Sequence, residues 1–179
     1  LNLYRECPRC FALAVKHGIQ RPRGPMPSIT TGLDSVVKGY FDRCRKAGVL
    51  PSFLTVEGRP LPAKLAVNFK ERLYADASAL LPELGLERRF CVLMGILDEC
   101  LLMDDGTYAP LDHKTRASAP PDVHPAYQLQ MDIYCLLLNE NRMRTNGRAY
   151  LVYYYPVATQ VMEHTIEFGF AVKEVAADV

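Results

Sequence analysis

The segment that decides the fold reads GILDECLLM at 95–103, DDG at 104–106 and TYAPLDHK at 107–114. Two runs of β-strand character flank an Asp-Gly turn signal, so the segment is predicted to form a β-hairpin. Side chains two positions apart on a strand share a face, so Asp112 and Lys114 should point the same way. With Asp98 from the first strand, they would form a group that can hold a hard divalent cation and activate a water beside it.

This group requires one particular register of the hairpin. A two-residue turn at Asp105-Gly106 would pair Asp98 with His113 and turn Asp98 to the other face, because a one-residue shift reverses every side chain. An arrangement with Asp98 opposite Asp112 needs an odd number of loop residues. We therefore predict a loop of three or five residues around 104–106, or a bulge with the same effect.

Both acids follow apolar residues, which favours a functional role for them. Asp112 follows Pro110-Leu111, and Asp98 lies among the apolar residues Met94, Ile96, Leu97, Leu101 and Leu102. A carboxylate in apolar surroundings is costly to bury unless a metal or a basic group pairs with it. His113 is expected to pack or to lie at the surface, with only its backbone near the acids.

The spacing Gly95-x-x-Asp98 … Asp112-x-Lys114 resembles the PD-(D/E)xK nuclease superfamily, and its RecB-like branch in particular. The segment QMDIY at 130–134 is similar to the Gln-x-x-x-Tyr helix motif of that branch. Upstream, CPRCF at 7–11 is similar to the Cys-Pro-Arg-x-Phe stretch that opens many of its members. Asp-x-Lys alone recurs by chance, but the four matches fall in the order that the family has.

The resemblance implies an α/β, restriction-endonuclease-like fold in a single domain over residues 1–179. Its αβββαβ core has a central mixed sheet flanked by helices, here with an added helix and an added edge strand. The expected helices cover 3–17, 32–47, 63–80 and 124–139. The expected strands cover 88–103 in two runs around Gly95, the second half of the hairpin, 148–156 and 163–172.

The resemblance also implies a Mg²⁺- or Mn²⁺-dependent deoxyribonuclease. Asp98, Asp112 and the backbone carbonyl of His113 would bind the metal, and Lys114 would position the attacking water. Relatives often carry a further ligand on an upstream helix, where Asp34 is the nearest substitute. An acid that only stabilises the first turn of that helix is an equal alternative for Asp34.

The substrate side of the site is also implied by the family. Gln130 and Tyr134, four apart on a helix and therefore neighbours, would orient the substrate or the lysine. DNA is the implied substrate, with exonuclease or endonuclease action open, and a helicase or another DNA-processing subunit is a candidate partner. Two alternatives remain open: a non-catalytic nucleic-acid-binding module on the same fold, and a subunit that acts only within a complex.

Charge is distributed unevenly along the chain. Residues 1–50 carry nine Lys or Arg and three Asp or Glu, whereas the rest carries twelve and seventeen, and the total net charge is +1. A basic first third fits a phosphate-binding surface beside a carboxylate site, and a solvated basic helix is the alternative. Arg21 and Arg23, in a Pro-rich segment over 20–27, are candidate phosphate contacts or ordinary loop residues.

The six cysteines are expected to be mainly reduced thiols in a cytoplasmic protein, because a chain of 179 residues with 49% hydrophobic content does not need disulfides. Cys7 and Cys10 lack the second pair that structural zinc sites use. Some RecB-like nucleases hold an iron–sulfur cluster with three cysteines beyond the last strand. No cysteine follows Cys135, so such a cluster is not expected within this chain. No apolar run reaches the roughly 18 residues of a membrane span, and no signal peptide is recognised.

Overall fold

The computed structural model describes residues 2–22, 28–67, 69, 72–78, 82, 91–157 and 165–178. The chain divides into two compact units, Leu1–Lys38 and Gly39–Val179. Each unit is described by itself, and a single domain over residues 1–179 stays a prediction. None of the helices in the described ranges is both long and apolar enough to cross a membrane.

The first unit consists of α1 (Asn2–Glu6), α2 (Pro8–His17) and the beginning of α3 (Ser28–Ala47). The predicted helix over 3–17 is therefore broken at Cys7, before Pro8, because proline is tolerated in the first turn of a helix but not in its interior. The thiol of Cys7 caps α2 by accepting the Cys10 N–H at 3.3 Å. Gly18 ends α2 with φ +68°, the left-handed conformation that favours glycine.

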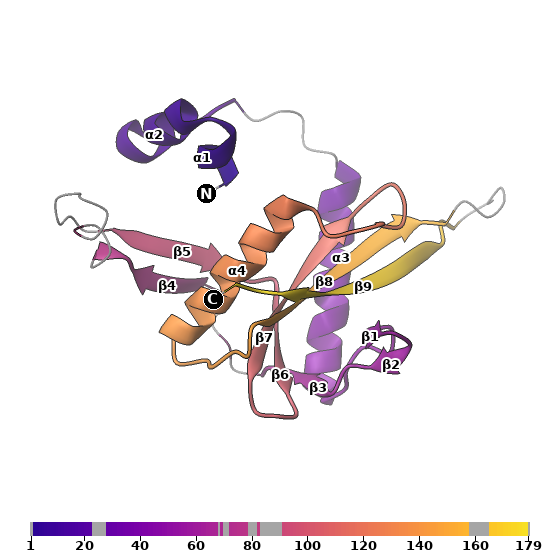
Figure 1. Cartoon of the computed structure of the whole chain (residues 1–179). Helices are drawn as coiled ribbons and strands as arrows, with labels where there is room; N and C mark the ends of the chain where they lie inside the picture. Colours follow the sequence, from indigo (N-terminus) through magenta and orange to yellow (C-terminus); the bar gives the residue numbers. More distant parts are fainter. Residues whose placement is uncertain are drawn as a thin grey trace. The chain divides into compact units, whose positions relative to one another are not determined.

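A five-stranded sheet forms the centre of the second unit (Figure 1). Its order is β3 (Ala63–Leu65), β6 (Glu99–Met103), β7 (Tyr108–Thr115), β8 (Arg148–Pro156), β9 (Phe168–Ala176). Only β7 and β8 are parallel, and α4 (Pro125–Glu140) supplies the crossover between them. The predicted α/β fold with a central mixed sheet and flanking helices is confirmed.

Two small sheets complete this unit. β1 (Thr55–Val56) pairs with β2 (Arg59–Pro60), and β4 (Arg72–Asp76) pairs with β5 (Val92–Ile96). The predicted helix over 63–80 is wrong, because β3 and β4 lie there. Leu73 and Ala75 are buried while Tyr74 between them is 52% exposed, an alternation with the period of a strand. Pairing with β5 and β6 outweighs the helix propensity of the alanines and leucines in this segment.

The helix α4 packs its apolar side against the sheet. Its Met131, Cys135 and Leu138 are fully buried and recur at helical spacing. They lie in two adjoining core clusters that also include Cys100 of β6 and Tyr153 of β8. Burial on both sides of α4 fixes its rotation, so Gln130 and Tyr134 face the strands that carry the predicted acids.

Gly95 lies where β5 passes close beneath α4. A Cβ at this position would meet the Leu137 side chain at 2.5 Å and the Tyr134 ring at 3.2 Å. Since Leu137 is fully buried, it has little room to give way. Glycine inside a strand suggests a bend or a close backbone approach, and at Gly95 the structure shows the close approach.

Gly95→Ala should therefore lower the free energy of unfolding by about 1–3 kcal/mol, the usual cost of overpacking a core. The matched control is Gly32→Ala in α3, where the added Cβ would meet no described atom within 4 Å apart from the backbone of its own helix and its chain neighbours. Chemical denaturation of both variants measures the effect. Equal stability of the two would show that α4 does not depend on this contact.

Candidate active site

The register of the β6–β7 hairpin brings Asp98 and Asp112 to the same face. Glu99 pairs with Leu111 and Leu102 with Tyr108, so the next position extends the ladder to Asp98 opposite Asp112. The loop holds three residues, 104–106, since the Met103 N–H donates to Thr107 O at 2.8 Å. Gly106 has φ +82°, which a residue with a side chain rarely adopts. The predicted odd-numbered loop is confirmed.

Asp98 lies at the bend between β5 and β6, and its side chain forms a hydrogen bond with the backbone of β7. Its Oδ2 accepts the His113 N–H at 3.1 Å. The N–H and C=O of one strand residue point to the same side of the strand, so the His113 carbonyl is directed toward Asp98 as well. The His113 ring lies on the opposite face, 4.7 Å from the Phe41 ring and with Nδ1 3.0 Å from the Tyr154 hydroxyl.

Lys114 is held by three groups on the Asp112 face. Its ammonium forms an ion pair with Asp112 Oδ2 and donates to Gln130 Oε1 at 2.9 Å. It also lies 4.6 Å from the centre of the Tyr127 ring, a cation–π contact. Asp112 is 3% exposed, so its charge is compensated by protein groups rather than by water.

Gln130 and Tyr134 of α4 tie these groups together. Gln130 Nε2 donates to Asp112 Oδ1 at 2.8 Å and to the Tyr134 hydroxyl at 2.9 Å. The Tyr134 hydroxyl in turn donates to the carbonyl of Ile96 at 2.6 Å, at the end of β5. A single chain of hydrogen bonds therefore joins β5, α4 and β7. Of the predicted pair, Gln130 contacts both Asp112 and Lys114, and Tyr134 contacts Gln130.

A family model described as the PD-(D/E)XK nuclease superfamily matches residues 43–176. The chain belongs to the PD-(D/E)XK nuclease superfamily. Among solved structures, the chain is similar to one titled "Crystal structure of SSO0001", with 16% identity and a TM-score of 0.44. That match covers 99% of this chain and 62% of the other, so the present chain spans less than two thirds of it. The curated proteins contain no match.

The oxygen atoms present fit the divalent cation that PD-(D/E)XK nucleases typically use. Asp98, Asp112 and the His113 carbonyl would supply hard oxygen ligands, the type that Mg²⁺ and Mn²⁺ prefer. In the described part of the chain, no three His, Cys, Asp or Glu side chains form one ligand group. Waters and a phosphate oxygen would therefore have to complete the coordination shell, as is usual for Mg²⁺.

Burial raises the pKa of Asp112 to about 6, although Lys114 opposes this shift, and the neighbouring Asp98 raises it further. Burial likewise raises the pKa of Tyr134 to about 12, so its hydroxyl stays protonated and keeps donating to Ile96. A carboxyl group with a raised pKa sits beside a second acid and a lysine. Ionisable side chains whose pKa values are shifted in this way are concentrated at the active sites of enzymes.

Binding of Mn²⁺ to the free protein should therefore depend on pH. Above about pH 6 Asp112 is ionised and the affinity should be constant, whereas below it a proton competes and the affinity should fall by about tenfold per pH unit. Calorimetric titration at several pH values between about 5 and 8 measures this. An affinity that stays constant down to pH 5 would mean that Asp112 is not a ligand.

The residues predicted from the basic first third have other partners or lie outside the described part. Arg21 forms an exposed ion pair with Glu6 at 3.5 Å, and Arg23 lies outside the described residues. Asp34, in the first unit, pairs with Lys38 at 3.5 Å. The roles of Arg21 and Asp34 stay predictions. All six cysteines are free thiols.

Arg45, one of the cations of the basic first third, is paired within the protein. Its side chain is 17% exposed and pairs with the buried Glu99 and with Asp42. Burial raises the pKa of Glu99 to about 7, and Arg45 opposes that shift. This pair joins the end of α3 to β6 directly beside Asp98. Sequence reasoning missed it because its two members are 54 positions apart.

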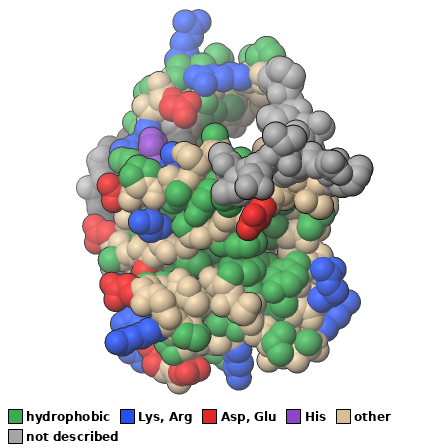
Figure 2. Space-filling model, turned by 90° about the vertical axis from the view of Figure 1, so that its right-hand side faces the viewer, with side chains coloured by type: hydrophobic (Ala, Val, Ile, Leu, Met, Phe, Trp, Pro, Cys, Tyr) green, Lys and Arg blue, Asp and Glu red, His purple; other side chains and the backbone are tan. Residues whose placement is uncertain are grey.

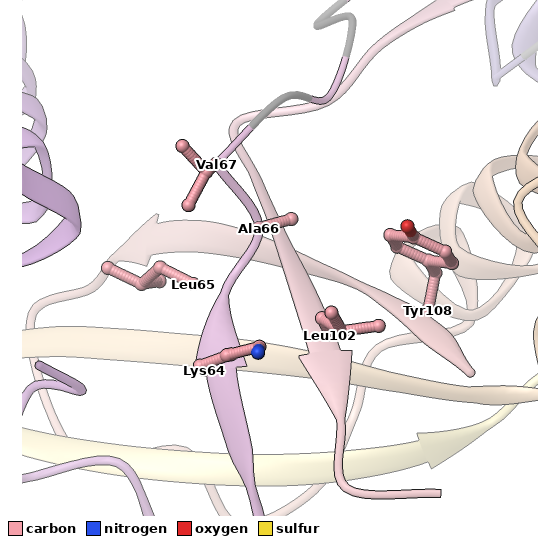
Figure 3. Close-up of a pocket in the computed structure, with 6 residues that line it drawn as sticks. All are labelled: Lys64, Leu65, Ala66, Val67, Leu102 and Tyr108. Carbon is pink, nitrogen blue, oxygen red and sulfur yellow. The ribbon is translucent and has the colours of Figure 1, made fainter. Parts of the chain in front are cut away.

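A hollow in this unit lies between β3, β6 and β7 (Figure 3), and neither Asp98 nor Asp112 lines it. It encloses about 240 Å³ and is lined by Lys64, Leu65, Ala66, Val67, Leu102 and Tyr108. These residues include no acid and one cation, so the hollow does not offer the chemistry of the Asp98–Asp112 group. On the face drawn in Figure 2, hydrophobic side chains gather near the middle of the view.

Proposed function

We propose that this chain is a Mg²⁺- or Mn²⁺-dependent nuclease of the RecB-like branch, which hydrolyses phosphodiester bonds of DNA. The observation that carries the proposal is the network in which Gln130 contacts Asp112, Lys114 and Tyr134 at once. This network joins two of the four motif segments, and the Tyr134–Ile96 and Asp98–His113 hydrogen bonds add a third, Gly95-x-x-Asp98. Membership of the superfamily supports hydrolysis of a nucleic acid.

Each residue has a definite role in this mechanism. Asp98, Asp112 and the His113 carbonyl would hold the cation, which when bound supplies Lewis acidity and a water that loses its proton more easily. Lys114 would position that water and stabilise the negative charge that grows on the phosphate. Lys114 is suited to this because its ammonium is fixed by Gln130 and Tyr127 as well as by Asp112.

Gln130 would keep the charged groups in register. Its amide nitrogen donates to Asp112 while its amide oxygen accepts from Lys114, so one side chain fixes both. Tyr134 holds the nitrogen end of that amide and is itself anchored to Ile96. Such fixed partners reduce the reorganisation that the reaction needs, which is the basis of electrostatic catalysis.

The test is a cleavage assay of the purified chain on single-stranded and double-stranded oligonucleotides with Mn²⁺, with EDTA in a parallel reaction. We expect cleavage that EDTA abolishes. Cleavage that continues in EDTA would contradict the metal-dependent mechanism. An RNA oligonucleotide of the same sequence tests the preference for DNA, and end-labelled against circular DNA distinguishes exonuclease from endonuclease action.

A second candidate function is that of a subunit which acts only with a partner, such as a helicase or another DNA-processing protein. The observation that favours it is that the helix over 28–47, where relatives often carry a further metal ligand, contains no histidine. Binding of DNA in Ca²⁺ without cleavage in Mn²⁺ would support this candidate or a non-catalytic binding module. The cytoplasmic location and the phosphate contacts of Arg21 and Arg23 are further parts of the proposal.

A further inference from the structure

A third charged residue follows the two that the family motif contains on β7. Arg116 comes directly after the last residue of the strand, and its N–H donates to Tyr154 O at 2.9 Å. This bond continues the ladder that pairs Lys114 with Tyr153 and Thr115 with Tyr154. The alternation of the strand therefore places Arg116 on the face of Asp112 and Lys114.

Unlike Arg45 and Arg148, Arg116 has no acid beside it in the described part of the chain. Arg45 pairs with Glu99, and Arg148 lies 3.8 Å from Glu174. Among the residues whose positions are described, no carboxylate lies within 4.0 Å of Arg116. The residue is half-buried, and its charge is therefore open to a ligand from outside the chain.

The surroundings of Arg116 are aromatic. On β8, Tyr155 is the next residue of the same face after Tyr153, and it pairs with Gly169 of β9. A Cβ at position 169 would lie 2.6 Å from the Tyr155 ring, so this ring lies directly against β9. The hydroxyl of Tyr153 is buried and has no hydrogen-bond partner in the described part of the chain. Burial raises the pKa of Tyr153, and the nearby Arg116 opposes that shift.

We infer that Arg116 binds the phosphate next to the scissile one, and that Tyr155 contacts the nucleoside attached to it. This inference rests on the proposed nuclease function and adds the path of the substrate, from Lys114 past the end of β7 and across β8. The two cations are separated by about 6.6 Å along the strand, which is comparable with the step between phosphates in an extended nucleic-acid strand. A guanidinium can bind a phosphate through two parallel hydrogen bonds, and an aromatic ring beside it suits a nucleotide better than a free anion.

The subsite requires a substrate with at least two phosphates. Arg116→Ala should weaken binding of an oligonucleotide in Ca²⁺ by about tenfold and should reduce the slope of log affinity against log salt by about 0.7–0.9, the loss of one phosphate contact. Arg116→Lys should keep most of the salt slope. In Mn²⁺, Arg116→Ala should raise KM for the oligonucleotide more than it lowers kcat. Hydrolysis of bis(p-nitrophenyl) phosphate, which has one phosphate, should stay as in the unaltered protein.

Arg148→Ala is the matched control, because it also removes one arginine from the five-stranded sheet. Arg148 lies on the opposite face of this sheet from Arg116 and at the other end of β8. Tyr155→Leu should weaken oligonucleotide binding, while Tyr155→Phe should not.

The inference would be overturned if Arg116→Ala had the same affinity for the oligonucleotide and the same salt slope as Arg148→Ala. A chain that cuts no substrate in Mn²⁺ would contradict the proposed function, whereas the binding measurements in Ca²⁺ would still report on Arg116. An equal loss of bis(p-nitrophenyl) phosphate hydrolysis would also overturn the subsite, because it would place Arg116 at the scissile phosphate.

Discussion

Replacing Asp112 with asparagine should abolish cation binding and cleavage together. The substitution removes the buried carboxylate that lies opposite Asp98, which leaves one acid and a carbonyl for the cation. Asparagine has the same shape and can still accept from Gln130, so the network should persist. We expect the rate of cleavage to fall by at least about 100-fold, the effect of losing one positioned charged group. Asp98→Asn should behave in the same way.

The measurement is a calorimetric titration with Mn²⁺ beside a cleavage assay on the same preparations. Asp104→Asn is the matched control, since Asp104 lies in the exposed loop of the same hairpin. Its affinity and its cleavage rate should equal those of the unaltered chain. If Asp112→Asn binds Mn²⁺ normally, Asp112 is not a ligand. If it binds none but still cleaves, the reaction does not use this site.

The central part of the fold was predictable because local rules determine it. Asp98 and Asp112 can share a face only with an odd number of loop residues, because their positions sum to an even number. Gly106 supplies the left-handed turn that a three-residue loop needs. Gln130 and Tyr134 are four positions apart, so their side chains lie on one side of α4 independently of the contacts that the rest of the chain makes. These arguments require no knowledge of distant contacts.

The parts that sequence reasoning missed depend on distant contacts. The segment over 63–80 has good helix formers, yet β3 and β4 form there because β5 and β6 offer free strand edges. Arg45 looks like one of several surface cations until Glu99 is known to lie beneath it. Tyr127 could have been found, since it precedes Gln130 by one helical turn. Its role as a neighbour of Lys114 needed the position of β7 against α4.

Lys114→Ala should separate the chemical step from cation binding. In the structure the ammonium and a bound cation would compete for Asp112, because Lys114 forms an ion pair with Asp112 Oδ2. Removing this positive charge should leave the affinity for Mn²⁺ unchanged or raise it. Cleavage should nevertheless fall by about 100-fold or more, because no other described cation is held by both Gln130 and Asp112.

The same titration and cleavage assay measure both effects, and Lys173→Ala is the control. Lys173 lies on β9, where its ammonium donates to Pro121 O at 3.3 Å, so its loss should change neither quantity. With Ca²⁺, Lys114→Ala should still bind DNA, and even the unaltered chain should cleave little, because the looser coordination of Ca²⁺ positions a water poorly. A Lys114→Ala protein that loses Mn²⁺ as completely as Asp112→Asn would show that the lysine supports the site structurally. A Lys114→Ala protein that cleaves at the normal rate would show that Lys114 takes no part in the reaction, because loss of the group that positions the attacking water must slow cleavage.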